Sequence, residues 1–176
     1  LEMGLGKTVV TLTAINNLMY DSFEISKALV IAPLRVAEDT WSRESEKWDH
    51  LKHLRISKIL GTPKQRRKAI AADADIYIVN RENVVWLCNE LSQIGDGWDF
   101  DAVIIDELSS FKSPKAQRFK ALRKYITRSS RVIGLTGTPA PNGLIDLWSQ
   151  IYLLDGGERL GKTVTGFRER YFVPNQ

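Results

Sequence analysis

The sequence has few of the residues that make covalent or metal crosslinks. It contains one cysteine, Cys88, which excludes an internal disulfide and a cysteine-based zinc site. Its two histidines, His50 and His53, lie in a polar stretch with no second cluster of metal ligands, which favours surface positions. The longest strongly apolar runs, such as 28–32 and 102–105, are far shorter than the ~20 residues of a membrane span. These absences predict a protein of a reducing, cytoplasmic setting with no membrane partner.

Acidic residues are absent from one strongly basic stretch, although the chain as a whole has a net charge of only +4. A solvated helix face is one explanation of that stretch, and an anionic partner that relieves the repulsion is the other. The stretch contains eight basic residues: Lys112, Lys115, Arg118, Lys120, Arg123, Lys124, Arg128 and Arg131.

Short apolar, β-branched runs alternate with segments of helical periodicity. Several runs are apolar at consecutive positions, as expected for strands that are buried on both faces of a parallel sheet. Proline after a capping residue predicts helix starts at Thr62-Pro63 and Ser113-Pro114. Helical spacing is also present in 9–18, 36–48, 82–91 and 144–154. The alternation predicts an open α/β domain. Its expected strands are 28–33, 55–60, 75–80, 102–106 and 131–136.

A glycine-rich segment, Gly4-Leu5-Gly6-Lys7-Thr8, precedes the apolar helix expected at 9–18. Glycines let backbone N–H groups point inward at a phosphate, and the dipole of the following helix favours an anion. Lys7 can reach the terminal phosphates, and the Thr8 hydroxyl can bind magnesium. The general pattern has a further glycine where this chain has Leu1.

Two further segments follow expected strands and strengthen this interpretation. Asp106 and Glu107 end an apolar strand, at the edge of an α/β sheet where ligands bind. One carboxylate there can hold magnesium and its neighbour can orient a water molecule, or the pair can simply be solvated. The turn 135–142 carries two hydroxyls that could sense the nucleotide, or it could only connect a strand to a helix that Asn142 caps.

Together these segments resemble the motors of helicase superfamily two, most closely the Swi/Snf-like ATPases and the short forms that bacterial viruses encode. Residues 3–8 match motif I, Asp106-Glu107 matches motif II, and 135–142, with its Thr-Gly-Thr-Pro string, matches motif III. Ala32-Pro33 with Trp41, Glu44, Lys47 and Trp48 resembles the motif Ia region. Asn80-Arg81-Glu82 falls where motif Ib is expected, and Arg168 to Phe172 resembles the end of the first lobe.

The resemblance implies an α/β, RecA-like P-loop lobe with a mostly parallel sheet and helices on both faces. It also implies that this lobe binds ATP and Mg²⁺ and contacts duplex DNA through sequence-independent backbone contacts. It implies Lys7, Asp106 and Glu107 as catalytic residues, and Thr8 and Asp106 as metal ligands. The implied nucleotide contacts are Met3, Gly4, Leu5, Gly6, Lys7 and Thr8. The implied coupling residues are Thr136, Gly137 and Thr138. The implied nucleic-acid contacts are Pro33, Arg35, Asn80, Arg81 and Lys112.

The same resemblance sets expectations for organisation and setting. Residues 1–155 would form the ATP-binding lobe, incomplete at its N-terminus, and 156–176 an extension towards a second lobe. The strand that feeds the phosphate loop would precede Leu1 and fill a central place in the sheet. The cytoplasm of a bacterial or phage-infected cell is the expected setting. After Asp-Glu the family usually has Ala-His, where this chain has Leu108-Ser109.

Two other hypotheses remain at this point. The chain could be a catalytically incomplete nucleic-acid-binding module, as the basic stretch and the missing second lobe would allow. A small P-loop kinase or GTPase is the other possibility. The sequence lacks the Asn-Lys-x-Asp string with which a GTPase reads guanine, and the Thr-Gly-Thr-Pro turn has no role in either enzyme.

Overall fold

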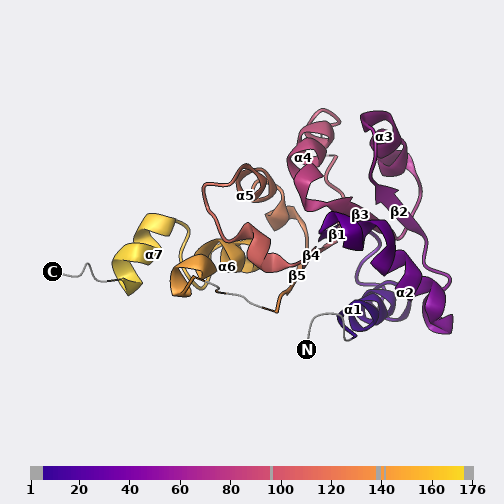
Figure 1. Ribbon diagram of the computed structural model, residues 1–176, viewed down its shortest axis with the longest axis horizontal. Helices are drawn as coiled ribbons and strands as arrows, with labels where there is room; N and C mark the ends of the chain where they lie inside the picture. The colour runs from indigo at the N-terminus through magenta and orange to yellow at the C-terminus, as the bar shows by residue number, and fades with distance from the viewer. Residues whose placement is uncertain (1–5, 96, 138–139, 141, 173–176) are drawn as a thin grey trace.

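A five-stranded, all-parallel sheet forms the centre of the molecule (Figure 1). The structure is a computed structural model that describes residues 6–95, 97–137, 140 and 142–172. The strand order is β2-β3-β1-β4-β5, so the chain crosses over between strands. The strands are β1 (Ala28–Ala32), β2 (Ile56–Ile59), β3 (Ile76–Asn80), β4 (Ala102–Asp106) and β5 (Arg131–Leu135). All five strands expected from the sequence are confirmed.

The three inner strands are buried on both faces. Every residue of β1, β3 and β4 is buried, as their consecutive apolar residues predict. The register pairs Ala32 with Asn80 and Asp106 with Leu135, so the strands end together at one edge. Residues that follow β1, β3, β4 and β5 are therefore neighbours along this carboxyl edge.

Helices cover both faces of the sheet, as predicted. On one face α1 and α2 pack on a core that contains Leu12, Ile15 and Trp41. On the other face α4, α5 and α6 pack on a core that contains Leu87, Phe119 and Trp148. Figure 1 shows α1 and α2 on the opposite side of the sheet from α3 and α4. The helices are α1 (Lys7–Asn16), α2 (Trp41–Lys47), α3 (Pro63–Ala71), α4 (Val84–Ser92), α5 (Gln117–Leu122), α6 (Leu147–Asp155) and α7 (Val164–Tyr171).

Local signals explain where some helices begin. Thr62 caps α3 in a capping box: its side chain accepts from the Gln65 N–H, and the Gln65 side chain accepts from the Thr62 N–H. The helix start predicted at Ser113-Pro114 is wrong, because α5 begins at Gln117. There the Ala116 N–H donates to the Ser113 carbonyl, which closes a turn with Pro114 at its second position.

Two further expectations are wrong. Asn142 does not cap the next helix, because Gly143 occupies that position and the Asn142 N–H donates to the Asp146 carboxylate. We also expected an unfilled position in the centre of the sheet, next to the phosphate loop. The five described strands instead pair without a gap, and the outermost strands are β2 and β5.

The C-terminal part extends away from the sheet. The helix α7 packs against α6 and buries Phe167, and it lies at the far end of the molecule in Figure 1. Residues 156–160 form turns after α6, in which Gly156 and Gly157 have positive φ. None of the described helices has the length and apolar character that crossing a membrane requires.

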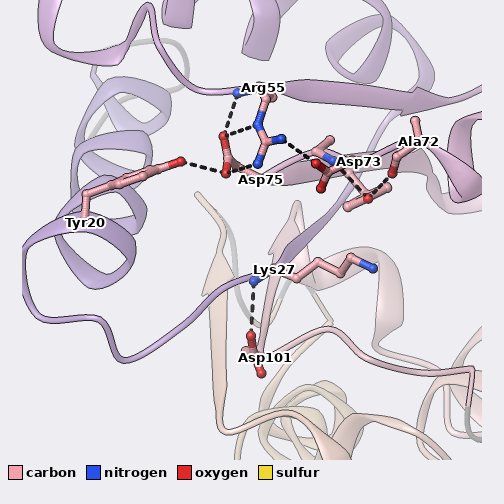
Figure 2. A network of polar contacts seen from close by, with 9 residues as sticks. Tyr20, Lys27, Arg55, Ala72, Asp73, Asp75 and Asp101 are labelled. Carbon is pink, nitrogen blue, oxygen red and sulfur yellow. Dashed lines mark hydrogen bonds and ion pairs between the residues drawn. The ribbon is translucent and has the colours of Figure 1, made fainter.

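A polar network joins the amino-terminal ends of the strands, opposite the carboxyl edge (Figure 2). The Asp75 carboxylate accepts from the Tyr20 hydroxyl at 2.8 Å and from the Arg55 backbone N–H at 2.8 Å. Arg55 also forms ion pairs with Asp73 and Asp75. Asp101 accepts from the backbone N–H groups of Ser26 and Lys27. These contacts tie the segment before β1 to the segments before β2, β3 and β4.

Candidate nucleotide-binding site

A cavity of about 500 Å³ lies at the carboxyl edge of the sheet, between the start of α1 and the end of β4. Its walls include Lys7 and Thr8 on one side and Asp106 and Glu107 on the other. The pair Lys7-Thr8 and the pair Asp106-Glu107 are about a hundred positions apart in the chain, yet the fold brings both pairs to one cavity. The described part of the phosphate-loop segment, Gly6 to Thr8, and the acidic pair therefore face a common cavity, as the sequence predicts.

The first wall is the amino-terminal end of α1. Gly6 precedes this helix with a φ of 78°, a left-handed conformation that glycine adopts without strain. The capping position is Gly6, which has no side chain to cap the helix, and the first turn contains no acidic residue. Its first N–H groups and its positive dipole end are therefore available to an anion. Met3, Gly4 and Leu5, the other expected nucleotide contacts, lie outside the described residues.

The second wall is the end of β4. Asp106 is 9% exposed, and it is the last residue of the strand. Glu107 then turns the chain with a φ of 58° and a ψ of 61°, which is unusual for a residue with a side chain. Left-handed residues other than glycine occur often at functional sites, where the surrounding structure holds them in place. This turn places two successive carboxylates at the cavity.

The electrostatic surroundings of Asp106 suit a cation. Burial raises the pKa of its carboxyl above the usual value, and the neighbouring Glu107 carboxylate acts in the same direction. The Trp41 indole N–H and the Lys7 ammonium oppose this rise. Because Lys7, Asp106 and Glu107 line one cavity, the lysine and the acidic pair lie together at one edge of the sheet.

The third wall is α2, which the sequence did not predict as part of the site. Glu44, Lys47 and Trp48 line the cavity, and the Trp48 indole N–H donates to the Glu44 carboxylate at 3.0 Å. Trp41, at the start of α2, is fully buried and its indole N–H donates to Asp106 Oδ2 at 3.2 Å. The motif Ia resemblance had marked these positions, but no sequence signal connects residues 41 and 106.

The expected nucleic-acid residues also lie along the carboxyl edge. Pro33 and the exposed Arg35 follow β1, and Asn80 and Arg81 lie at the end of β3, which pairs with β1. The Asn80 side chain is buried, and its amide donates to Glu82 at 3.0 Å. The structure thus brings the two segments together, and it assigns the Asn80 side chain to a local hydrogen bond.

The remaining candidates are more scattered. Thr136 and Gly137 follow β5, next to the acidic pair at the end of β4, whereas Thr138 lies outside the described residues. Lys112 follows the 3₁₀ turn after Glu107, and its backbone carbonyl accepts from the Ser149 hydroxyl.

Several side chains of the basic stretch have partners within the folded chain. Arg131 pairs with Glu24, Arg123 stacks on the Tyr152 ring, and the Arg128 guanidinium lies over the Tyr125 ring. These local contacts support the explanation that part of the stretch belongs to the folded surface. An anionic partner remains an explanation only for the other basic residues of the stretch.

Comparison with known proteins assigns the fold and the site to a family. A family model described as the SNF2-related domain matches residues 2–174, which is nearly the whole chain. The chain belongs to the SNF2-related domain family. The Swi/Snf-like resemblance inferred from the sequence is therefore confirmed.

Two curated relatives show the range of this SNF2-related domain. A putative protein p41 from Acyrthosiphon pisum secondary endosymbiont phage 1 is 46% identical, over 97% of this chain and 38% of that protein. The ISWI chromatin-remodeling complex ATPase ISW1 from Saccharomyces cerevisiae is 30% identical, over 87% of this chain and 13% of its own length. The chain thus spans less than half the length of each of these two relatives.

A solved structure has the same fold. The Sulfolobus solfataricus SWI2/SNF2 ATPase core in complex with dsDNA superposes with a TM-score of 0.78 at 29% identity. The match covers 95% of this chain and 32% of that one. The RecA-like fold expected for the SNF2-related domain is therefore confirmed.

Proposed function

We propose that this chain is the ATP-binding first lobe of a DNA-dependent ATPase that moves along duplex DNA. The observation that carries the proposal is the shared cavity, with Lys7 and Thr8 opposite Asp106 and Glu107. Family membership supports the ATPase class, and the DNA complex of the related core supports a duplex partner. The second lobe would lie outside the residues of this chain, which spans only part of the length of its relatives.

The donor set fits magnesium. Asp106 and Thr8 would supply a carboxylate and a hydroxyl oxygen, the hard ligands that magnesium prefers. Among the described residues no group of three or more His, Cys, Asp or Glu side chains gathers as a metal cage. Magnesium commonly binds one or two carboxylates together with substrate phosphates and water, so a sparse protein set is appropriate. The bound ion would neutralise charge on the phosphates.

The residues of the chain would divide the work of hydrolysis. The N–H groups at the start of α1 and the Lys7 ammonium would hold the terminal phosphates of ATP. Glu107 would orient a water molecule and accept its proton as the oxygen attacks the γ-phosphate, which leaves ADP and inorganic phosphate. Burial around Asp106 limits the access of bulk water and strengthens these charge interactions.

The nucleic-acid side of the proposal uses the same edge of the sheet. The segments at Pro33–Arg35 and Asn80–Arg81, with Lys112, would contact the phosphate backbone of DNA. Such contacts are independent of sequence and weaken with salt, as movement along any DNA requires. Thr136 to Thr138, after β5, would relate the nucleotide state to this grip. The lobe would comprise residues 1–155, with 156–176 leading to the second lobe.

The test is ATP hydrolysis by the full-length protein with and without duplex DNA. We expect DNA to increase the rate, and Lys7→Ala to lower it by about a hundredfold or more, because a charge that stabilises the phosphates is lost. Lys64→Ala, an exposed lysine at the start of α3, is the matched control and should change little. A rate that neither DNA nor Lys7→Ala alters would reject the proposal.

The alternative is a nucleic-acid-binding module without catalysis, and the basic stretch favours it. Binding to duplex DNA at several salt concentrations separates the two. The motor predicts an affinity that changes with bound nucleotide. A salt-sensitive affinity that nucleotide does not alter, in a full-length protein without ATP hydrolysis, would favour the module instead.

A further inference from the structure

The acidic wall of the cavity has a buried hydrogen-bond partner on α2. Trp41 is fully buried, and its indole N–H donates to Asp106 Oδ2 at 3.2 Å. The two residues are 65 positions apart and come from the first turn of α2 and the last residue of β4. This contact is therefore a tertiary one, and it depends on how α2 packs against the sheet.

Packing alone does not explain the choice of partner. A buried indole N–H needs an acceptor, and a backbone carbonyl is sufficient. Trp148 shows this in the same chain: it is 2% exposed, and its indole N–H donates to the Gly161 carbonyl at 3.0 Å. Trp41 instead donates to a carboxylate that lines the cavity. Its hydrogen bond engages Oδ2, and the Glu107 backbone N–H is a further donor to the same carboxylate.

A carboxylate that binds a metal is usually held by hydrogen bonds from groups behind it. Such groups fix the rotation of the carboxylate, and their loss typically lowers metal affinity about 10- to 100-fold. Trp41 occupies this place relative to Asp106. Its ring is fully buried within the core on that face of the sheet, so the donor is held rigidly.

We propose that Trp41 is a positioning residue, whose indole N–H fixes the Asp106 carboxylate in the orientation that binds magnesium with ATP. The inference rests on the proposed function, because it assumes that Asp106 is a metal ligand. It adds a residue from α2 to the machinery of the site. Trp41 does so without touching nucleotide, metal or the reacting atoms.

Isothermal titration calorimetry of ATP with the full-length protein tests this, once in magnesium and once in EDTA. Trp41→Phe keeps an aromatic ring and removes the N–H. We expect it to weaken ATP binding in magnesium about tenfold and to leave binding in EDTA unchanged. Trp148→Phe removes a comparable buried indole hydrogen bond in the core on the other face of the sheet, where the residue does not line the cavity, and it should leave both affinities unchanged.

The outcomes separate this inference from the proposed function. If the unaltered protein binds ATP equally well in magnesium and in EDTA, metal binding at Asp106 fails and the inference fails with it. If magnesium strengthens binding in the unaltered protein and equally in Trp41→Phe, only the inference is overturned. A loss of equal size in magnesium and EDTA would show a general packing role and would also overturn it.

A double variant tests whether Trp41 acts through Asp106. Asp106→Asn should remove most of the magnesium effect, and adding Trp41→Phe to it should cause no further loss, because both changes remove one interaction. Fully additive losses would contradict the inference.

NMR of indole N–H groups provides a measurement that does not depend on the folding of Trp41→Phe. Asp106→Asn should shift one tryptophan indole signal, because the acceptor of Trp41 changes from a charged to a neutral oxygen. Indole signals that all keep their positions would overturn the inference.

Discussion

At the scale of single residues, Glu107 combines an unusual backbone with the chemistry expected of the site. Its left-handed conformation follows directly after the buried Asp106. The two neighbouring carboxylates therefore differ in environment, because Asp106 is mostly buried and Glu107 is more accessible. In the proposed function this difference separates a metal ligand from a group that accepts a proton.

The first prediction follows from this division. Glu107→Gln in the full-length protein should preserve ATP binding and lower the rate of ATP hydrolysis about 10²- to 10⁴-fold, because an amide cannot accept the proton of the water. Glu46→Gln, an exposed carboxylate on α2, is the matched control. Calorimetry measures binding and phosphate release measures the rate. Unchanged hydrolysis in Glu107→Gln would contradict the assignment.

The sequence predicted which residues lie together where the prediction depended on motifs. Lys7, Thr8, Asp106 and Glu107 were placed together because each follows or precedes an expected element of a parallel sheet, and parallel strands end at a common edge. Trp41 could not be connected to Asp106 in this way. Its contact depends on how α2 packs, and residue types and spacing do not specify helix packing across 65 positions.

At the scale of elements, α3 depends on its ends more than on burial. None of its residues is fully buried, and only Ala69 and Ile70 pack, partly buried, against the core. The Thr62 capping box and the bidentate pair of Arg67 with Glu90 hold it in place. We therefore expect the stability of α3 to be sensitive to its cap.

Thr62→Ala should lower the free energy of unfolding by about 1 kcal/mol, since the Gln65 N–H at the start of α3 loses the Thr62 hydroxyl as its acceptor. Amide hydrogen exchange should increase first in 63–71. Thermal denaturation and hydrogen exchange of the full-length protein measure both effects, with Lys64→Ala as the control in the same turn. Unchanged exchange in α3 would show that its contacts, and not its cap, determine its stability.

Leu108 and Gly134 fit each other across two elements. A Cβ at Gly134 would lie 2.5 Å from Leu108 Cδ2 and 3.3 Å from Leu154 Cδ2, so β5 can only approach these side chains with a glycine at that position. Leu108 is the residue that replaces the alanine usual in the resembled motif. The substitution is therefore accommodated by a close approach of the backbone.

Gly134→Ala should destabilise the protein by about 1–3 kcal/mol, because the added methyl group overpacks this contact. The double variant Gly134→Ala, Leu108→Ala should lose less stability than the sum of the losses in the two single variants, because the smaller side chain at 108 makes room for the added methyl group. Urea denaturation of the four proteins measures this. Strictly additive losses would mean that the two positions do not share the same space.

The elements themselves were largely predictable, and their ends were less so. The strands were predicted within one or two residues because consecutive β-branched residues between polar segments leave little choice. Ser113-Pro114 misled because proline suits both the first turn of a helix and the second position of a β-turn. Only the hydrogen bond from Ala116 to Ser113 distinguishes the two.

At the scale of the whole molecule, the network in Figure 2 connects segments that are far apart in the chain. Burial alone would raise the pKa of Asp75, but hydrogen bonds from Arg55 and Tyr20 outweigh it and hold the pKa below the usual value. The pKa of Asp101 is also lowered: burial opposes the change, and hydrogen bonds from Ser26 and Lys27 prevail. Both carboxylates therefore stabilise the fold in their charged form.

This predicts an acid limit to stability. A carboxylate whose folded pKa is depressed contributes stability that is present above its unfolded pKa of about 3.9 and is lost as the pH falls through the folded pKa. Asp75→Asn should therefore lower stability at neutral pH and reduce the loss below about pH 4. Melting temperatures across pH measure this, with the exposed Asp21→Asn as control. Equal pH profiles for Asp75→Asn and the unaltered protein would contradict it.

The order of strands has a consequence for synthesis on the ribosome. Of the five described strands, the first to be made, β1, is the one in the middle, and its neighbours β3 and β4 follow only after several intervening helices. Until they emerge, the apolar β1 has both edges unpaired and depends on non-local contacts that form slowly. The nascent chain therefore cannot form the cavity between α1 and β4 before Glu107 has left the exit tunnel, and its apolar strand edges stay exposed until then.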